Sequence, residues 1–344
     1  MRIAQIAPLA EAVPPELYGG TERVVSWLTE ALIEQGHEVT LFASADSRTS
    51  GRLIPCAPHS LRLAGINNHV ASHLAMLDQA LRMADEFDLM HFHIDALHFP
   101  VFRHLAYKCL TTLHGRQDLA DYWPAYQTFP EMKLVAVSDE QRVPVPDANF
   151  VGTVHHGTPP DLIPFEPEGG DYLVFIGRIS PEKRPDRAIE IARMSQRKLR
   201  IAAKVDPYDR VYFREQIKPL LASPWVEFLG EIDDTQKPRF FGEACALLFP
   251  IDWPEPFGLS IIEAMSAGTP TISWRQGAAP EILEDGRNGF LVESIDEAVA
   301  AVEASAALPR QGVRAAFERR FTAARMAADY LALYEKAIGP GRKI

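Results

Sequence analysis

Short apolar runs alternate with longer amphipathic segments along most of the chain. In the first half, several runs have the length and apolar content of buried strands, and segments with apolar residues at helical spacing lie between most of them. The strands predicted there are Arg2–Ala7, Val39–Ala43, Asp88–Ile94, Cys109–Leu113 and Lys133–Val137. Strands that alternate with helices form parallel sheets covered on both faces, so the pattern predicts an α/β fold.

The same alternation returns after a proline-rich stretch from Pro144 to Pro167, which has the composition of an interdomain connection. A final amphipathic stretch from about Ala315 to Ile338 has no strand after it, and we expect it to pack back across the first domain. The strands predicted between them are Tyr172–Ile176, Leu199–Val205, Val226–Leu229, Ala246–Ile251, Thr269–Trp274 and Phe290–Val292.

The length of 344 residues allows two domains, each with a core of its own. We expect a first domain of residues 1–160, joined by a C-terminal helix of about residues 322–344, and a second domain of residues 161–321. Apolar residues make up 47% of the chain and charged residues 24%. This usage excludes a disordered chain and a coiled coil.

The formal net charge of −11 disfavours general nucleic-acid binding, because an acidic protein repels a phosphate backbone. The cysteines, Cys56, Cys109 and Cys245, are far apart and suggest neither a disulfide framework nor a thiolate zinc site. No apolar run approaches the roughly 18 residues of a membrane span, and the first residues lack a signal-peptide pattern. We therefore expect a cytoplasmic protein without a transmembrane segment.

Histidines mark two strand ends of the first half. His91 and His93 alternate at period two, which places both rings on one face of a strand. They are either half of a metal site or part of strand-end packing, and packing is favoured because no acidic or cysteine ligand stands at a suitable spacing. His114 follows the strand Cys109–Leu113, at the carboxyl end where open α/β sheets bind ligands.

Basic residues gather at a strand end of the second half. Arg178 and Lys183 flank the loop after the strand Tyr172–Ile176, and Lys204 is the last residue but one of the next predicted strand. These positions predict an anion site at the carboxyl edge of the sheet.

A pair of carboxylates follows the strand Ala246–Ile251. Glu255 lies between two prolines, Gly258 begins a predicted helix that contains Glu263, and Gly268 ends it. The free N–H groups of the helix start can bind phosphate or sugar oxygens. Carboxylates accept hydrogen bonds from neighbouring hydroxyls, so Glu263 suits a ribose and Glu255 a hexose, unless both are surface glutamates on an exposed turn.

The chain lacks the usual signatures for holding a nucleotide through glycine-rich loops or a metal. It has no Gly-x-Gly-x-x-Gly after a strand, no Gly-Lys-Ser/Thr and no Asp-x-Asp. A diphosphate would then be held without magnesium, with Arg178, Lys183 and a helix start in place of the divalent ion. We expect no metal and no cofactor.

The motifs together resemble the family 4 glycosyltransferases, retaining enzymes of the GT-B fold. The resemblance covers nearly the whole chain and implies two Rossmann-like domains with parallel sheets that face each other across a cleft, the C-terminal helix packing on the first. It rests on Gly19-Gly20-Thr21-Glu22, His114-Gly115, the run from Gly177 to Lys183, and Glu255-x7-Glu263 with its continuation to Pro270.

By this resemblance, Arg178 and Lys183 bind the donor diphosphate, Glu255 the donor hexose and Glu263 its ribose, while His114 lies beside the transferred sugar. The implied catalytic residues are Arg178, Lys183, Glu255 and His114. The remaining donor-binding positions are Gly20 and Gly19 in the first domain, and Phe257, Gly258, Leu259, Glu263 and Lys204 in the second, Lys204 as a third cation.

The chain departs from the family pattern at a few places. Arg184-Pro185 follows Lys183 where the family usually has glycine, and His155-His156-Gly157 stands where Asn-Gly is common. Ala202-Ala203-Lys204 replaces a glycine-rich stretch.

The expected activity is transfer of a hexose from a nucleoside-diphosphate sugar, with UDP or GDP as the expected carrier, to a hydroxyl acceptor bound by the first domain. The resemblance implies retention of anomeric configuration by front-face attack, without a metal. The alternatives are a nucleotide-sugar epimerase of the same shape, a glycoside hydrolase that uses Glu255 and Glu263, and a non-catalytic sugar-nucleotide binding protein.

Overall fold

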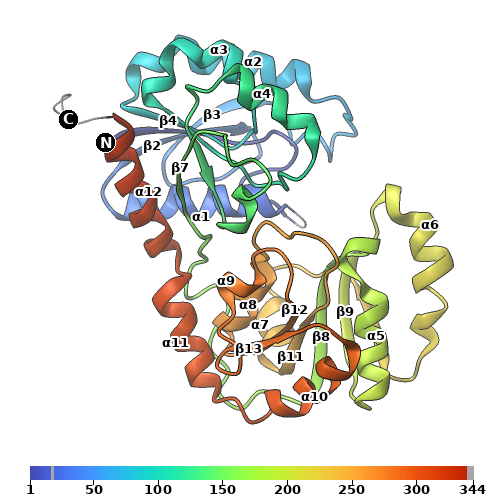
Figure 1. Cartoon of the computed structure of the whole chain (residues 1–344). Helices are drawn as coiled ribbons and strands as arrows, with labels where there is room; N and C mark the ends of the chain where they lie inside the picture. The colour runs from blue at the N-terminus through green and yellow to red at the C-terminus, as the bar shows by residue number, and fades with distance from the viewer. Residues whose placement is uncertain (17–18, 339–344) are drawn as a thin grey trace. The chain divides into compact units, whose positions relative to one another are not determined.

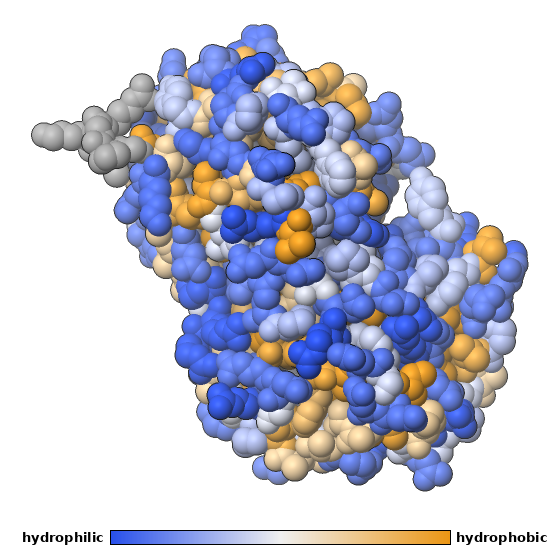
Figure 2. Space-filling model, viewed as in Figure 1, coloured by the Kyte–Doolittle hydropathy of each residue, from blue (hydrophilic) through white to orange (hydrophobic). Residues whose placement is uncertain are grey.

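The computed structural model describes residues 1–16 and 19–338 and divides the chain into two compact units (Figure 1). The first unit consists of Met1–Gly157 with the chain from Ala323 onward, and the second is Thr158–Thr322. The last residues of the expected C-terminal helix, 339–344, lie outside the described part. In the view of Figure 2, polar residues cover most of the surface and apolar residues are scattered among them.

The first unit contains a seven-stranded parallel sheet with the order β3-β2-β1-β4-β5-β6-β7. Its strands are β1 (Arg2–Ile6), β2 (Glu38–Ser44), β3 (Arg52–Ala57), β4 (Leu89–Phe92), β5 (Cys109–Thr112), β6 (Leu134–Ala136) and β7 (Phe150–Thr153). Its helices are α1 (Gly20–Glu34), α2 (Val70–Arg82), α3 (Phe99–Phe102), α4 (Trp123–Thr128) and α12 (Ala323–Ile338).

The C-terminal helix α12 packs on the first unit, as the amphipathic pattern predicts, and contacts α1 (Figure 1). Met326, Tyr330 and Tyr334 recur at helical spacing and are fully buried. The single helix expected from about residue 315 is wrong, because α11 (Arg310–Arg320) and α12 are separate helices. The carbonyl of Phe321, between them, accepts a hydrogen bond of 2.9 Å from the backbone N–H of Thr158.

The second unit repeats the architecture with a six-stranded parallel sheet of order β10-β9-β8-β11-β12-β13. The strands are β8 (Tyr172–Arg178), β9 (Leu199–Lys204), β10 (Val226–Gly230), β11 (Ala244–Phe249), β12 (Thr271–Trp274) and β13 (Gly289–Val292). Besides α11, the helices are α5 (Pro185–Met194), α6 (Arg210–Tyr212), α7 (Lys237–Gly242), α8 (Leu259–Ser266), α9 (Ala279–Ile282) and α10 (Ile295–Ser305).

Strand order explains where each unit can bind a ligand. The order reverses between β1 and β4 in the first sheet and between β8 and β11 in the second. At such a switch point the connections leave toward opposite sides, and the carboxyl ends of the two strands border a crevice. The central strand β11 is buried along its whole length, which explains its uninterrupted apolar sequence.

Two strands were not predicted, and both lie at edges of the first sheet. The pattern of β3 is broken by Arg52 and Pro55, and most residues of β7 are only half-buried. An edge strand is covered on fewer sides, so its apolar signal is weak. The proline-rich stretch 144–167, interpreted as a connection, therefore contains β7.

Arg310, at the start of α11, ties together the chain segments that precede β8 and surround β11. Its guanidinium donates hydrogen bonds of 2.7 Å to the carbonyl of Glu166 and of 2.9 Å to those of Gly242 and Ala244. These carbonyls belong to two segments, the chain before β8 and the junction of α7 and β11, so one side chain fixes their arrangement.

We expect the substitution Arg310→Met to lower the free energy of unfolding of the second unit by about 3 kcal/mol, because it leaves several carbonyls without their donor. Urea unfolding followed by circular dichroism measures this change. Arg193→Met is the control, since Arg193 is exposed on α5 and bonds only to Glu190 among the described contacts. Equal urea midpoints of unfolding for the two variants would contradict a stabilising role of Arg310.

Candidate functional site

The predicted anion site lies at the carboxyl ends of β8 and β9. Arg178 is the last residue of β8, and the parallel register places it opposite Lys204 of β9. Paired residues of neighbouring strands point to the same face of the sheet. The structure therefore brings these two predicted cations together.

Both cations have carboxylate partners. Arg178 lies 3.3 Å from Glu182 Oε1 and 3.5 Å from Asp209 Oδ2, and Lys204 Nζ lies 4.0 Å from Asp206 Oδ2. The side chain of Arg178 remains 35% exposed, and these contacts are long for charged hydrogen bonds. A ligand of higher negative charge can displace or join such partners.

Lys183 and Glu255, predicted separately from two motifs, are in direct contact. Lys183 Nζ donates to Glu255 Oε2, and the indole Nε1 of Trp253 donates to the same oxygen at 2.9 Å. The ammonium also lies 5.1 Å from the ring centre of Trp253 and 5.5 Å from that of Phe249. Only 18% of the Lys183 side chain and 13% of that of Glu255 are exposed, so this is a largely desolvated ion pair.

The loop that carries Glu255 is fixed from two sides. The N–H of Asp252 donates to the carbonyl of Glu182 at 2.8 Å, and the carbonyl of Glu255 accepts from Ala278 at 3.0 Å. Gly277, with φ of 53°, packs so closely that a Cβ atom there would lie 2.4 Å from the backbone nitrogen of Glu255. Gly277 is a positioning residue that sequence reasoning missed, and its Gly-Ala-Ala-Pro context after β12 was the available signal.

The helix predicted to begin at Gly258 is α8. Gly258 adopts φ of 94°, which favours glycine, and Leu259 is the first helical residue. Gly268 follows the helix with φ of 82°. Phe257 is buried, with its ring 6.2 Å from that of Phe321.

Glu263 is buried on α8 and paired with a cation that the sequence analysis did not identify. Lys237 Nζ of α7 lies 2.7 Å from Glu263 Oε1 and 3.2 Å from Asp234 Oδ1. Only 8% of the Lys237 side chain and 6% of that of Glu263 are exposed. The alternative of two surface glutamates on an exposed turn is therefore wrong. Nothing in the local sequence around Lys237 marked it, because its partner is 26 positions away.

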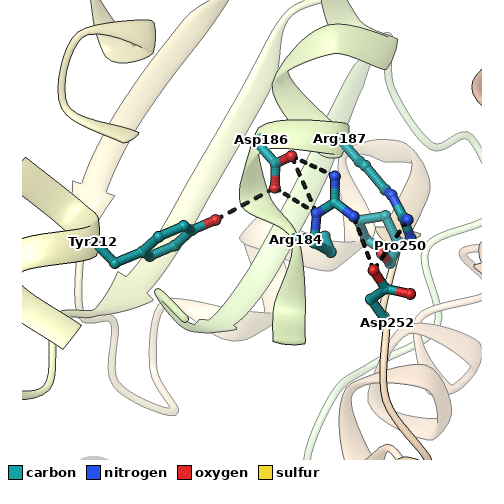
Figure 3. Close-up of polar contacts among 6 residues, drawn as sticks. All are labelled: Arg184, Asp186, Arg187, Tyr212, Pro250 and Asp252. Atoms are coloured by element: carbon teal, nitrogen blue, oxygen red, sulfur yellow. Dashed lines mark hydrogen bonds and ion pairs between the residues drawn. The ribbon is translucent and has the colours of Figure 1, made fainter. Parts of the chain in front are cut away.

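Arg184 occupies the position where the family usually has glycine, and it adopts a left-handed conformation with φ of 51°. Figure 3 shows its guanidinium between Asp186 and Asp252, with contacts of 2.7 Å and 2.9 Å. Arg187 also reaches Asp252, at 3.2 Å. Burial raises the pKa of Asp186, but its hydrogen bonds to Arg184 outweigh this and the net pKa is below the ordinary value. The cluster ties the turn after Lys183 to the loop before Glu255.

The other predicted residues, Gly19, Gly20 and His114, belong to the first unit. Gly19 precedes α1, and a Cβ atom there would lie 2.8 Å from Pro15 Cβ; Gly20 is the first helical residue. His114 follows β5, and burial lowers its pKa to about 3, so its imidazole is neutral. Its Nε2 lies 2.9 Å from Nδ1 of His93.

His91 and His93 lie side by side, as their period-two spacing predicts, with ring centres 4.1 Å apart. His91 bonds to Tyr334 and Thr112, while His93 bonds to Gln5 and His114. Within residues 1–16 and 19–338, no group of three or more metal-ligating side chains gathers in one place. The histidines are part of a hydrogen-bonded packing network.

Two family models match the chain. The model described as "Glycosyltransferase Family 4" matches residues 18–140, and the model described as "Glycosyl transferases group 1" matches residues 163–319. The chain is 26% identical over 393 residues to a phosphatidyl-myo-inositol mannosyltransferase of Mycolicibacterium smegmatis, covering all of this chain and 96% of the relative. It is 25% identical to a D-inositol 3-phosphate glycosyltransferase of Corynebacterium efficiens, covering 87% and 85%.

Solved structures share the fold over nearly the whole chain. AviGT4, a glycosyltransferase of avilamycin A biosynthesis, superposes with a TM-score of 0.76 at 23% identity, covering 98% of both chains. Anabaena Alr3699/HepE, crystallised with UDP and glucose, gives a TM-score of 0.73 at 18% identity and covers 97% of this chain and 99% of its own.

The two parallel α/β units have the GT-B fold of these solved glycosyltransferases. The chain belongs to the family 4 glycosyltransferases, and it is a transferase enzyme. No helix among the described residues has the length and hydropathy to cross a membrane.

The left-handed Arg184 allows a test of its positioning role. We expect Arg184→Ala and Arg184→Gly each to lower kcat/KM about tenfold, because both leave Asp252 with the Arg187 contact alone and loosen the loop before Glu255. Arg184→Gly is the more stable of the two by about 1 kcal/mol, since glycine adopts positive φ without the Cβ penalty. Thermal unfolding and initial rates measure the two effects, and full activity in both variants would exclude the role.

Buried neutral histidines make the first unit sensitive to acid. The pKa of His98 is lowered by burial to about 3, whereas an unfolded histidine titrates near 6.5. Between these values the unfolded chain binds more protons, so the free energy of unfolding falls as pH decreases below about 6.5. Urea unfolding at pH 7 and pH 5 measures the loss. We expect His98→Asn to lose less free energy of unfolding than the native chain between pH 7 and pH 5. An equal loss in both proteins would contradict a contribution from His98.

Proposed function

We propose that this enzyme transfers a hexose from a nucleoside-diphosphate sugar to a hydroxyl acceptor, with retention of anomeric configuration and without a metal ion. The observation that carries the proposal is the contact between Lys183 and Glu255 at the switch point of the second sheet, beside the start of α8. In this proposal Lys183 supplies a cation for a phosphate and the adjacent Glu255 a carboxylate for sugar hydroxyls, which is the pairing that a nucleotide sugar requires.

The diphosphate binds to Arg178, Lys183 and Lys204. Exposed ion pairs such as that of Arg178 with Glu182 are worth only about 0–1 kcal/mol, so a diphosphate can replace the carboxylates at little cost. Negative charge grows on the leaving diphosphate in the transition state. Fixed cations and backbone N–H groups at the start of α8 stabilise that charge in the manner otherwise supplied by magnesium.

Glu255 orients the donor sugar. Because Lys183 and Trp253 both donate to its Oε2, the carboxylate is held in one orientation, with the hexose hydroxyls bound at its Oε1. Glu263, fixed by Lys237, binds the ribose hydroxyls. In the front-face mechanism the acceptor hydroxyl attacks from the side of the leaving group, and a leaving phosphate oxygen takes its proton.

The relatives suggest where a substrate screen begins. Two of them are named for acceptors that contain inositol, and the solved relative from Anabaena was crystallised with UDP and glucose. UDP-glucose and GDP-mannose are therefore the first donors to test, with cyclic polyols among the first acceptors.

We place the enzyme in the cytoplasm, because Cys56, Cys109 and Cys245 are all free thiols.

The test is acceptor-dependent release of nucleotide from a panel of UDP- and GDP-sugars in the presence of EDTA. We expect Arg178→Gln and Lys183→Met to lower turnover by about 10²–10³, because each removes a donor to the developing phosphate charge. Arg193→Gln, a charge change on the outer face of α5, is the matched control and keeps full activity.

The other activities give different results in the same assay. An epimerase converts the donor without any acceptor, a glycoside hydrolase cleaves glycosides without a nucleotide, and a binding protein shows no turnover. Product configuration, determined by NMR of the new glycosidic bond, decides between retention and inversion. Full turnover in the two cation variants, or loss of activity in EDTA, would sink the proposal.

A further inference from the structure

A buried hydrogen-bond network connects His114 to the C-terminal helix within the first unit. His114 Nε2 lies 2.9 Å from His93 Nδ1, and His93 Nε2 lies 2.7 Å from Gln5 Oε1. Gln5 Nε2 donates to the hydroxyl of Tyr334 at 3.3 Å, and that hydroxyl lies 2.7 Å from His91 Nδ1. Gln5 and Tyr334 are fully buried, and His93 is 3% exposed.

The orientation of the Gln5 amide, with its oxygen toward His93 and its nitrogen toward Tyr334, assigns a proton to each ring of this network. The amide oxygen of Gln5 only accepts, so His93 Nε2 carries a proton. Burial lowers the pKa of His93 well below its usual value, and a neutral imidazole has a single N–H, so His93 Nδ1 accepts. The proton between His93 and His114 therefore belongs to His114 Nε2.

The part of the network beyond Gln5, at Tyr334, His91 and Thr112, is connected to the Gln5 amide nitrogen. That nitrogen donates to Tyr334, the Tyr334 hydroxyl then donates to His91 Nδ1, and His91 Nε2 donates to Thr112 at 2.7 Å. Turning the Gln5 amide around would reverse this direction and place the proton between His93 and His114 on His93 Nδ1, so the tautomer of His114 reports the orientation of Gln5.

We propose that Gln5, His93 and Tyr334 are positioning residues that hold His114 as the Nε2–H tautomer, so that its Nδ1 accepts a hydrogen bond from a hydroxyl of the bound sugar. The contact between His114 and sugar rests on the proposed function, whereas the tautomer rests on the network alone. The C-terminal helix therefore does more than pack on the first unit. Tyr334 of α12 orients the Gln5 amide, and that amide in turn orients His93.

The tautomer is measured directly in the full-length chain. Labelling its 11 histidines with ¹⁵N and recording a two-bond ¹⁵N–¹H correlation spectrum at pH 7 separates protonated from unprotonated ring nitrogens. His114 is assigned by the signal that disappears in His114→Gln. We expect a protonated Nε2 and an unprotonated Nδ1; a protonated Nδ1 in the native chain overturns the proposal.

Two substitutions of similar size at His93 separate hydrogen bonding from packing. His93→Asn keeps an oxygen near the place of Nδ1 as acceptor for His114, whereas His93→Leu removes it. We expect the native tautomer in the Asn variant and a mixture with Nδ1–H in the Leu variant. Donor KM rises about three- to tenfold in the Leu variant and stays within about twofold in the Asn variant, from loss of one neutral hydrogen bond.

The kinetic pattern distinguishes this role from a merely structural one. Partial misfolding reduces the active fraction and lowers kcat at constant KM, whereas loss of the sugar contact raises KM. A changed tautomer in His93→Leu with an unchanged donor KM contradicts the sugar contact. A native chain that releases no nucleotide from any donor contradicts the proposed function and with it the sugar contact, while the spectrum still decides the tautomer separately.

Discussion

The ion pair of Lys183 and Glu255 is the interaction on which the second unit's site depends. Each charge follows a different central strand, and each is largely removed from water. A buried charge without a partner is costly, so the two loops are stable in this arrangement only together. A second ion pair connects the same two loops. The guanidinium of Arg184, in the turn after β8, binds Asp252 in the loop after β11 (Figure 3).

Strand order determines that these loops meet at all. The carboxyl ends of parallel strands lie at one edge of the sheet, so the loops that begin there are neighbours. The strand order reverses between β8 and β11, so the helices that follow these loops lie on opposite faces of the sheet and leave a crevice between the two loops. Arg178 and Lys204 are the last residues of β8 and β9, and Glu255 lies in the loop after β11. The place of each cation at the end of a predicted strand was therefore enough to predict that the cations lie at the same edge of the sheet.

Sequence reasoning succeeded where the signal was local and failed where it was not. Central strands such as β11 are covered on both faces and read as continuous apolar runs, whereas the edge strands β3 and β7 do not. Gly258 was identified from its place before a helix. Lys237 was missed because its significance comes entirely from Glu263, which lies on another helix, and pairing across such a distance leaves no pattern in sequence.

The buried polar groups around the two sets of candidate site residues differ in charge. The second unit compensates charge with charge, as at Lys237 and Glu263. The histidine network of the first unit is neutral, because burial lowers the pKa values of His91 and His93 well below the ordinary value. A neutral network has directional hydrogen bonds but no net charge, which suits recognition of uncharged hydroxyls.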